Sequence, residues 1–288
     1  MNTVARRTVH GGHPVVFSYL AVTRFPLQLL KFPNLQSGSS KSQAPTPPEQ
    51  GVTARGGNSM WGIMIHSATW AATESTPFIV LEVIGTMAFA ISGVMAAARA
   101  RMDWLGAVVL ALGVAIGGGT IRDLLLGQLP VAWLERTWPA LLAIGTAVLM
   151  LVILRFWPQA HLDASTPLLI ADAVGLSAFV VIGTQIGLQA GLNPFLAVML
   201  GVLTGVGGGV IRDLLTGRKP VVLVGQIYAV AGIIGGAWFA IATERGVNTQ
   251  VSVWTSVALI FLIRVVAIRL DWHLPRALPI QQSDGQTE

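Results

Sequence analysis

Apolar stretches long enough to cross a bilayer recur along this chain from Phe78 onward, and they restrict the possible folds more than any other feature. A transmembrane helix needs about 20 mostly apolar residues. Only 11% of the residues are charged, compared with about a quarter in soluble domains. The sequence therefore predicts an all-α polytopic membrane protein. We expect seven transmembrane helices, at residues 77–98, 104–126, 138–156, 167–188, 194–216, 222–242 and 251–268.

A segment of 15 residues occurs twice in the chain. GGGTIRDLLLGQLPV at residues 117–131 matches GGGVIRDLLTGRKPV at residues 207–221, with 11 of 15 positions identical at an offset of 90. Chance does not produce a match of this length and identity. The chain therefore contains an internal duplication.

The duplication extends over three helices. The same offset pairs Glu82 with Asp172 in the first helix of each copy, so we interpret residues 77–156 and 167–242 as repeats and residues 251–270 as an additional seventh helix. Each copy has an odd number of spans, so the second copy enters the membrane from the opposite face. An inverted 3+3 repeat of this kind is typical of transport proteins, which place their substrate path between the two halves.

Basic residues indicate the orientation, because positive charge collects on the cytoplasmic side of a membrane protein. They follow four alternate helices: Arg99, Arg101, Arg155, Arg218, Lys219, Arg269 and Arg276. The N-terminus is then outside and the C-terminus cytoplasmic, in a multi-pass protein of a bacterial inner (plasma) membrane. We expect residues 271–288 to be a disordered cytoplasmic tail.

The first 59 residues differ from the remainder of the chain. They are rich in proline and basic residues, and their one apolar run, at residues 14–22, is too short to span a bilayer. We interpret residues 1–59 as a disordered leader. Two alternatives stay open: translation that begins at Met60 or Met64, and a cleaved signal peptide.

Three consecutive glycines lie near the middle of the second helix of each repeat. Glycine weakens a helix by about 1 kcal/mol relative to alanine, so these triplets predict breaks or kinks. Broken helices at equivalent positions of two repeats indicate a binding or conduction site. Close helix packing is the alternative role of such small residues. The predicted kinks are Gly117, Gly118, Gly119, Gly207, Gly208 and Gly209.

Ionisable side chains lie at membrane depth beside these triplets, where they are costly and usually functional. The candidate pore and gate residues are Arg122, Asp123, Arg212, Asp213, Glu82 and Asp172. Four acids and two arginines make this set negative, so a path lined by it should favour cations. A structural clamp between repeats is the alternative role for the Arg-Asp pairs. We interpret Arg264 as an anchor that extends to the membrane surface.

Other classes of protein find little support. The chain has no cysteine, and its five histidines show no ligand spacing, so no metal site or cofactor is expected. GGGTIRD lacks the lysine and the Ser/Thr of a phosphate-binding loop, and no nucleophile-base set lies in the membrane, so the chain is not expected to be an enzyme. Nucleic acid is not an expected partner, because the basic residues flank apolar segments without interleaved aromatics.

The duplicated GGG-x-IRDLL-x-G-x-x-P pattern, with an acid-x-x-Gly motif in the first helix of each repeat, resembles the bacterial branch of the trimeric intracellular cation channel family. The same domain is also known as a glycine transporter domain. The resemblance implies a homotrimer in which each subunit has its own pore for potassium and other monovalent cations. It places the kinks at both glycine triplets and the gate at the two Arg-Asp pairs, with Glu82 and Asp172 beside them.

A passive, potassium-preferring cation channel is therefore the predicted function, gated by bending at the glycines. Its partners would be monovalent cations and membrane lipids, although the helix at 167–188 has no basic cluster like the one that holds a phosphoinositide in animal members. A small-amino-acid (glycine) transporter is the first alternative. A structural membrane protein without a permeant is the second.

Overall fold

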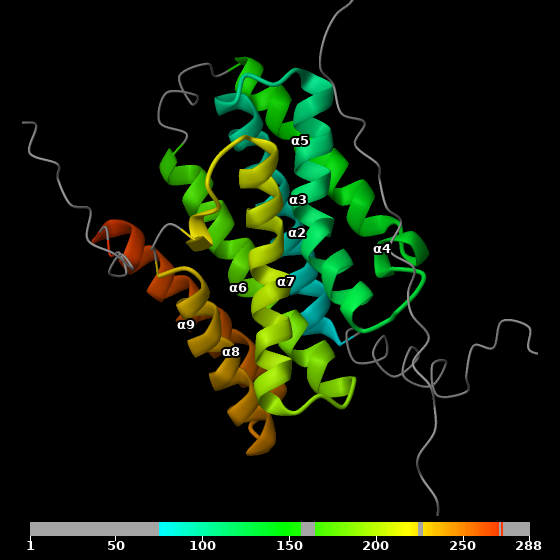
Figure 1. Ribbon diagram of the computed structural model, residues 1–288, viewed down its shortest axis with the longest axis vertical. Helices are drawn as coiled ribbons and strands as arrows, with labels where there is room; N and C mark the ends of the chain where they lie inside the picture. Colours follow the sequence, from blue (N-terminus) through cyan, green and yellow to red (C-terminus); the bar gives the residue numbers. More distant parts are fainter. Residues whose placement is uncertain (1–74, 157–164, 224–226, 271, 273–288) are drawn as a thin grey trace, which may run out of the picture. The chain divides into compact units, whose positions relative to one another are not determined.

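The computed structural model describes residues 75–156, 165–223, 227–270 and 272. Every regular element in this part of the chain is helical. The elements in order are α2 (Thr76–Arg99), α3 (Trp104–Leu125), α4 (Ala132–Glu135), α5 (Trp138–Phe156), α6 (Ser165–Gln189), α7 (Pro194–Leu215), the 3-10 helix η2 (Val221–Leu223), α8 (Ala229–Glu244) and α9 (Thr249–Arg269) (Figure 1). The predicted leader at 1–59 and the predicted tail at 271–288, apart from Trp272, lie outside the described residues.

Six of these helices are long and apolar enough to span a membrane: α2, α3, α5, α6, α7 and α9. The remaining long helix, α8, is apolar but has only 16 residues. The chain is therefore an all-α polytopic membrane protein, as the sequence predicts.

The predicted start of the sixth helix at residue 222 is wrong. The segment Val221–Leu223 forms a separate 3-10 turn, and α8 begins at Ala229. The backbone N–H of Val221 donates to Asp213 Oδ2 at 2.9 Å. This bond holds the apolar segment at the end of α7, so its residues do not join the following helix. Hydropathy alone cannot distinguish these two outcomes.

The centre of the bundle is a tight contact between the first helices of the two repeats, α2 and α6. Gly85 on α2 lies against Phe179, and Gly175 on α6 lies against Phe89. The two phenylalanine rings stack with centroids 5.3 Å apart and an interplanar angle of 18°. The acid-x-x-Gly motifs therefore mark close helix approach, as small residues do in membrane proteins.

Helices α3 and α7, both labelled in Figure 1, pack against each other, and the glycine triplets lie at this contact. A Cβ added to Gly118 would overlap the carbonyl oxygen of Thr204, and one added to Gly208 would overlap that of Val114. A Cβ on Gly207 would lie 3.1 Å from the Cα of Gly118. Both helices are continuous through their triplets, so neither is broken there, and the kinks stay a prediction. Close backbone contact accounts for the small residues here.

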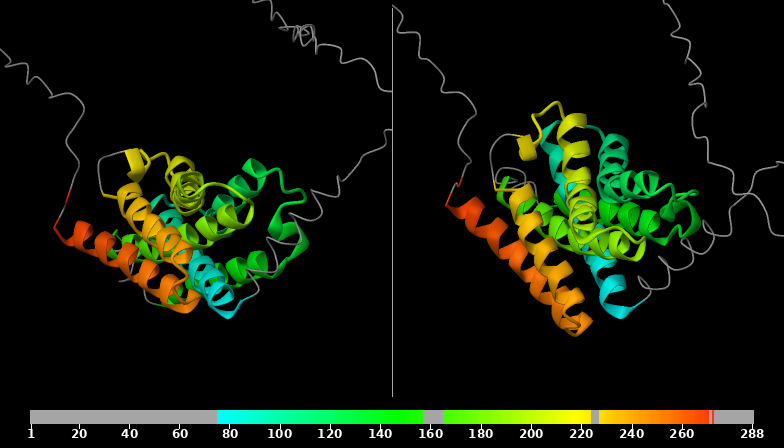
Figure 2. Two further views of the ribbon diagram at one scale, coloured as in Figure 1. Left: turned by 90° about the horizontal axis from the view of Figure 1, so that it is seen from below. Right: turned by 60° about the horizontal axis from the view of Figure 1, so that its bottom comes forward.

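Helices α8 and α9 lie side by side at one edge of the bundle, where both contact α6 (Figure 2). Gly235 permits this contact, because a Cβ there would overlap Ile260 of α9. The helix outside the two repeats is thus attached to the second repeat, and it brings Arg264 toward that repeat's polar residues.

Candidate functional site

The duplicated motif forms the same polar clamp at the end of the second helix of each copy. At the end of α3, Arg122 Nε and Nη2 donate to Asp123 Oδ1 at 2.9 and 2.7 Å. The other carboxylate oxygen, Asp123 Oδ2, accepts from the N–H of Ala132 at 2.9 Å. Gly127 follows at φ +66°, a left-handed turn that glycine adopts without strain. The clamp ties the loop after the helix to the helix end.

The end of α7 repeats this arrangement. Arg212 Nε donates to Asp213 Oδ1 at 2.9 Å, and Asp213 Oδ2 holds the N–H of Val221. The turn glycine is Gly217, at φ +69°. Each Arg-Asp pair thus bonds within its own copy, whereas the structural alternative places a clamp between the repeats. The two pairs do not bond to one another in the described part of the chain.

The two polar centres, one around Arg122 and Asp123 and the other around Arg212 and Asp213, differ in the hydrogen-bond partners of the arginine. Arg212 Nη1 also donates to Asp172 Oδ1 at 2.5 Å and to Ser92 Oγ on α2 at 2.7 Å. Its side chain is 1% exposed, so this network is buried. In the first copy Arg122 bonds to Asp123, and Glu82, which aligns with Asp172, lines a cavity instead.

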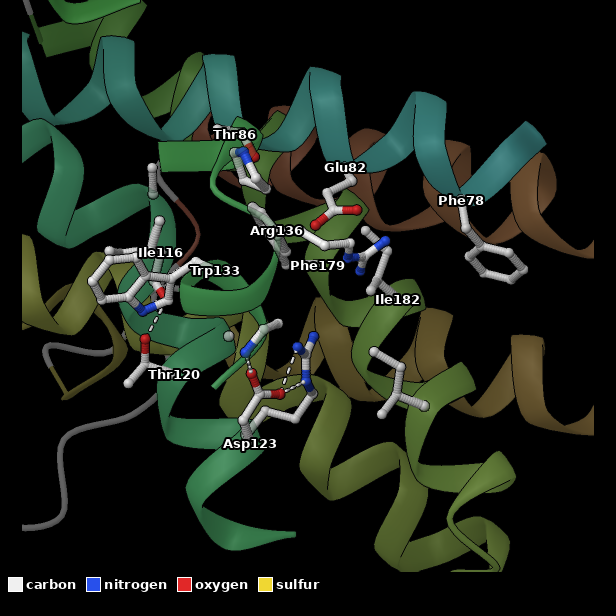
Figure 3. Close-up of a pocket in the computed structure, with 16 residues that line it drawn as sticks. Phe78, Glu82, Thr86, Ile116, Thr120, Asp123, Trp133, Arg136, Phe179 and Ile182 are labelled. Atoms are coloured by element: carbon white, nitrogen blue, oxygen red, sulfur yellow. Dashed lines mark hydrogen bonds and ion pairs between the residues drawn. The ribbon is translucent and has the colours of Figure 1, made fainter. Parts of the chain in front are cut away.

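This first cavity holds about 50 Å³, room for a few waters. It lies between α2, α3, α4 and α6, and Glu82 and Arg136 both point into it (Figure 3). Its floor is the Arg122-Asp123 pair. Phe78, Thr86 and Trp133 complete much of its wall. The structure therefore gathers three predicted site residues, Glu82, Arg122 and Asp123, around one cavity.

A second cavity, of about 120 Å³, lies at the equivalent place in the second copy. Its floor is Arg212 and Asp213, and its wall includes Leu168, the counterpart of Phe78. Arg99, Thr216, Arg218 and Lys219 line its rim. Each copy thus has a hollow that reaches its own Arg-Asp pair.

Arg264 is part of the second centre, so its predicted role as a surface anchor is wrong. It is fully buried, and its guanidinium carbon lies 4.6 Å from the ring centroid of Tyr228. Arg264 Nη1 donates to the carbonyl of Ile227 at 3.3 Å. The two residues just before α8 provide both partners, and α9 packs close enough for the side chain to turn inward.

The charge balance predicted for the site is also wrong. Arg136 joins Glu82 in the first copy, and Arg264 joins the second, so four acids face four arginines: Glu82, Asp123, Asp172 and Asp213 against Arg122, Arg136, Arg212 and Arg264. Net negative charge is therefore no basis for cation selectivity. The described residues contain no cluster of acids and histidines suited to a metal ion.

Comparison with known proteins gives the same division into two copies. A family model described as Glycine transporter matches residues 79–155 and again residues 169–244. A UPF0126 membrane protein of Vibrio cholerae is 40% identical over 206 residues, which cover 70% of this chain and 83% of that protein. The UPF0126 inner membrane protein YadS of Escherichia coli K12 is 42% identical over 195 residues, covering 67% and 92%.

Solved structures with the same fold include cation channels. The TRIC trimeric intracellular cation channel orthologue from Rhodobacter sphaeroides is 37% identical with a TM-score of 0.63, covering 67% of this chain and 97% of that chain. A second TRIC cation channel is 36% identical with a TM-score of 0.63, covering 70% and 98%.

The apolar helices and the inner-membrane relative make this a multi-pass bacterial inner-membrane protein built on a duplicated helical unit, and its solved relatives are channels rather than enzymes. The chain belongs to the bacterial branch of the trimeric intracellular cation channel family, whose domain also carries the glycine transporter description.

Sequence reasoning missed four polar residues of the two centres: Ser92, Arg136, Tyr228 and Arg264. Arg264 carried a usable signal, because an arginine five residues inside the end of an apolar helix is rare without a buried partner. Ser92 and Tyr228 carried none, since they resemble ordinary packing residues until α2 and α8 are placed beside Arg212.

Proposed function

We propose that this protein is a passive channel for monovalent cations, potassium in particular, with one path in each subunit between its two copies. The observation that carries the proposal is the pair of equivalent cavities, each ending at a buried Arg-Asp pair. Similarity to solved TRIC cation channels supports cations as the permeant. An inverted arrangement of the copies would open the cavities to opposite sides, with an outside N-terminus and a cytoplasmic C-terminus.

The second centre is the proposed closed gate. Arg212 lines the second cavity and links α7 to α6 through Asp172 and to α2 through Ser92. Opening requires α3 and α7 to shift where their glycine triplets touch, because that crossing lies directly beside both Arg-Asp pairs. Bending at the triplets would move the arginines together with the helix ends.

The proposed assembly is a homotrimer in membrane lipid. The solved relative from Rhodobacter sphaeroides is described as trimeric. On this chain, many large apolar side chains on the outer faces of α3, α5 and α9 are exposed, as lipid or subunit contact requires.

Potassium flux into proteoliposomes tests the proposal. The wild-type chain should dissipate a potassium gradient at a rate that saturates weakly. Glu82→Gln should alter the flux severalfold, because it removes a charge that faces the cavity without belonging to a clamp. Glu244→Gln, an exposed acid at the end of α8, is the matched control and should leave the flux unchanged. No potassium flux from folded wild-type protein would refute the channel.

A small-amino-acid carrier is the second candidate, and one observation favours it. Arg264 Nε and Nη2 and Asp172 Oδ2 are buried without hydrogen-bond partners. An arginine edge can bind a carboxylate with two hydrogen bonds, and an aspartate oxygen can bind an ammonium group. Saturable glycine uptake with counterflow would favour this function over the channel. Arg264→Met should then abolish the uptake, and the same vesicles should show no potassium flux.

A further inference from the structure

The two cavities occupy equivalent positions, yet their linings differ in charge. In the first, Glu82 and Asp123 balance Arg122 and Arg136. In the second, four basic groups face one carboxylate, that of Asp213. Three of those bases lie at the exposed rim: Arg99, Arg218 and Lys219.

Within the duplicated segment, the differences between the copies are concentrated at this rim. Within the duplicated segment only four positions differ, and three of them line the second cavity: Thr216, Arg218 and Lys219, where the first copy has Leu126, Gln128 and Leu129. Outside the segment, Arg99 aligns with Gln189. Every basic group at the rim therefore replaces an uncharged residue of the other copy, while the Arg-Asp floor is kept.

Positive charge at a rim lowers the local concentration of cations. Three unit charges about 10 Å from an aqueous path, screened at an ionic strength of about 0.1 M, reduce the local cation concentration roughly twofold. At about 1 M salt the screening length falls to about 3 Å and the effect disappears. The cavity with balanced charge has no such effect.

We propose that Arg99, Arg218 and Lys219 form a cation-repelling mouth that makes potassium conduction asymmetric. This inference rests on the proposed channel function. Potassium entering from the mouth of the second cavity carries less current than potassium entering from the mouth of the first. The three bases thus set the direction of easier flow, and the buried Arg-Asp pairs do not.

A role in membrane orientation is the competing explanation, since bases collect on the cytoplasmic side. That role requires positive charge anywhere on this side, whereas conduction responds only to charge at the path. Arg155 is the matched control: it is exposed, ends α5 on the same predicted side, and lines a different cavity, beside Asp103 and Trp104.

Single-channel recording of the full chain tests the proposal, and the absence of native cysteine makes charge adjustable in place. In symmetric KCl at about 0.1 M, wild-type currents at opposite voltages should differ about twofold, and the ratio should approach one at about 1 M. Arg218→Cys should reduce the ratio. A cationic methanethiosulfonate reagent should restore it, and an anionic reagent should push it below that of the unmodified variant. Lys219→Cys provides a second site if the first variant does not fold.

Arg155→Cys with the same reagents should keep the wild-type ratio. Equal currents in both directions at low salt, or equal responses at Arg218→Cys and Arg155→Cys, overturn the proposed mouth while leaving the channel intact. A folded wild-type chain that passes no potassium overturns the channel itself, so the two failures are distinguishable.

Discussion

The polar centres of the two copies contain the same Arg-Asp clamp but differ in the further hydrogen-bond partners of the arginine. Both attach a loop to a helix end through an Arg-Asp pair and a left-handed glycine. Only Arg212 extends further, to an acid and a serine on two other helices, whereas the acid of the first copy faces a cavity. Duplication has therefore preserved the local structure, and the two copies differ in whether the helix acid is bonded to the arginine or faces a cavity.

The largest expected difference between the copies concerns their helix acids. Asp172→Asn should lower the free energy of unfolding by about 3 kcal/mol, because it removes one partner of a buried ion pair. Glu82→Gln should lower it by about 1 kcal/mol or less, since Glu82 is partly exposed and lines a cavity. Denaturation in mixed detergent micelles measures both. Equal losses would mean that the two centres are equally closed.

The third glycine of each triplet provides a sharper comparison. A Cβ on Gly209 would lie 2.7 Å from Tyr228 Oη, whereas one on Gly119 meets only the end of Arg122, at 3.7 Å. Gly209→Ala should therefore destabilise the protein by about 1–3 kcal/mol. Gly119→Ala should be neutral or stabilise it by up to about 1 kcal/mol through helix propensity. Melting temperatures compare the two variants, and a larger loss at Gly119 would contradict the packing described.

The N-terminal caps of α3 and α7 should contribute equally to the stability of the two copies. Asp103 Oδ1 accepts from the N–H of Gly106 at 2.6 Å, and Asn193 Oδ1 accepts from that of Leu196 at 2.9 Å. Asp103→Ala and Asn193→Ala should each cost about 1 kcal/mol. Unfolding of both variants under the same conditions checks this equality. A loss in one variant several times that in the other would show that one cap has a further role.

Arg264 should make the smallest contribution to stability. It has no ion-pair partner among the described residues, and two of its nitrogens are buried without hydrogen bonds. Arg264→Met should therefore leave the free energy of unfolding within about 1 kcal/mol of wild type. A thermal melt measures the change. A loss as large as that of Asp172→Asn would indicate that Arg264 holds the second centre together.

Most of the fold could be predicted from the sequence. The transmembrane helices follow from hydropathy, and the duplication follows from the sequence identity between the two copies. Both ends of each copy's second helix were predicted closely, since Asp103, Asn193 and the IRDLL segments are local signals. The start of α8 could not be predicted, because the N–H of Val221 donates a hydrogen bond to Asp213, which lies before the loop, and this bond fixes Val221.

The site was predicted only in part. The sequence identified the six ionisable residues of the repeats, and the structure brings Glu82 to the first Arg-Asp pair and Asp172 to the second. It did not reveal which arginine bonds which acid, because Glu82 and Asp172 align but have different neighbours. The balancing charges of Arg136 and Arg264 come from outside the matched positions, so no internal alignment could find them.

The reciprocal contact of Gly85 with Phe179 and Gly175 with Phe89 has a consequence for how the halves relate. Each half supplies a knob and a hole to the other, which is the pattern of a self-complementary dimer interface. Neither three-helix half can fill its own hole. Halves expressed as separate chains, divided between α5 and α6, should therefore co-purify as a pair, and two halves each stable alone would contradict this. The single chain behaves as a tethered two-fold dimer.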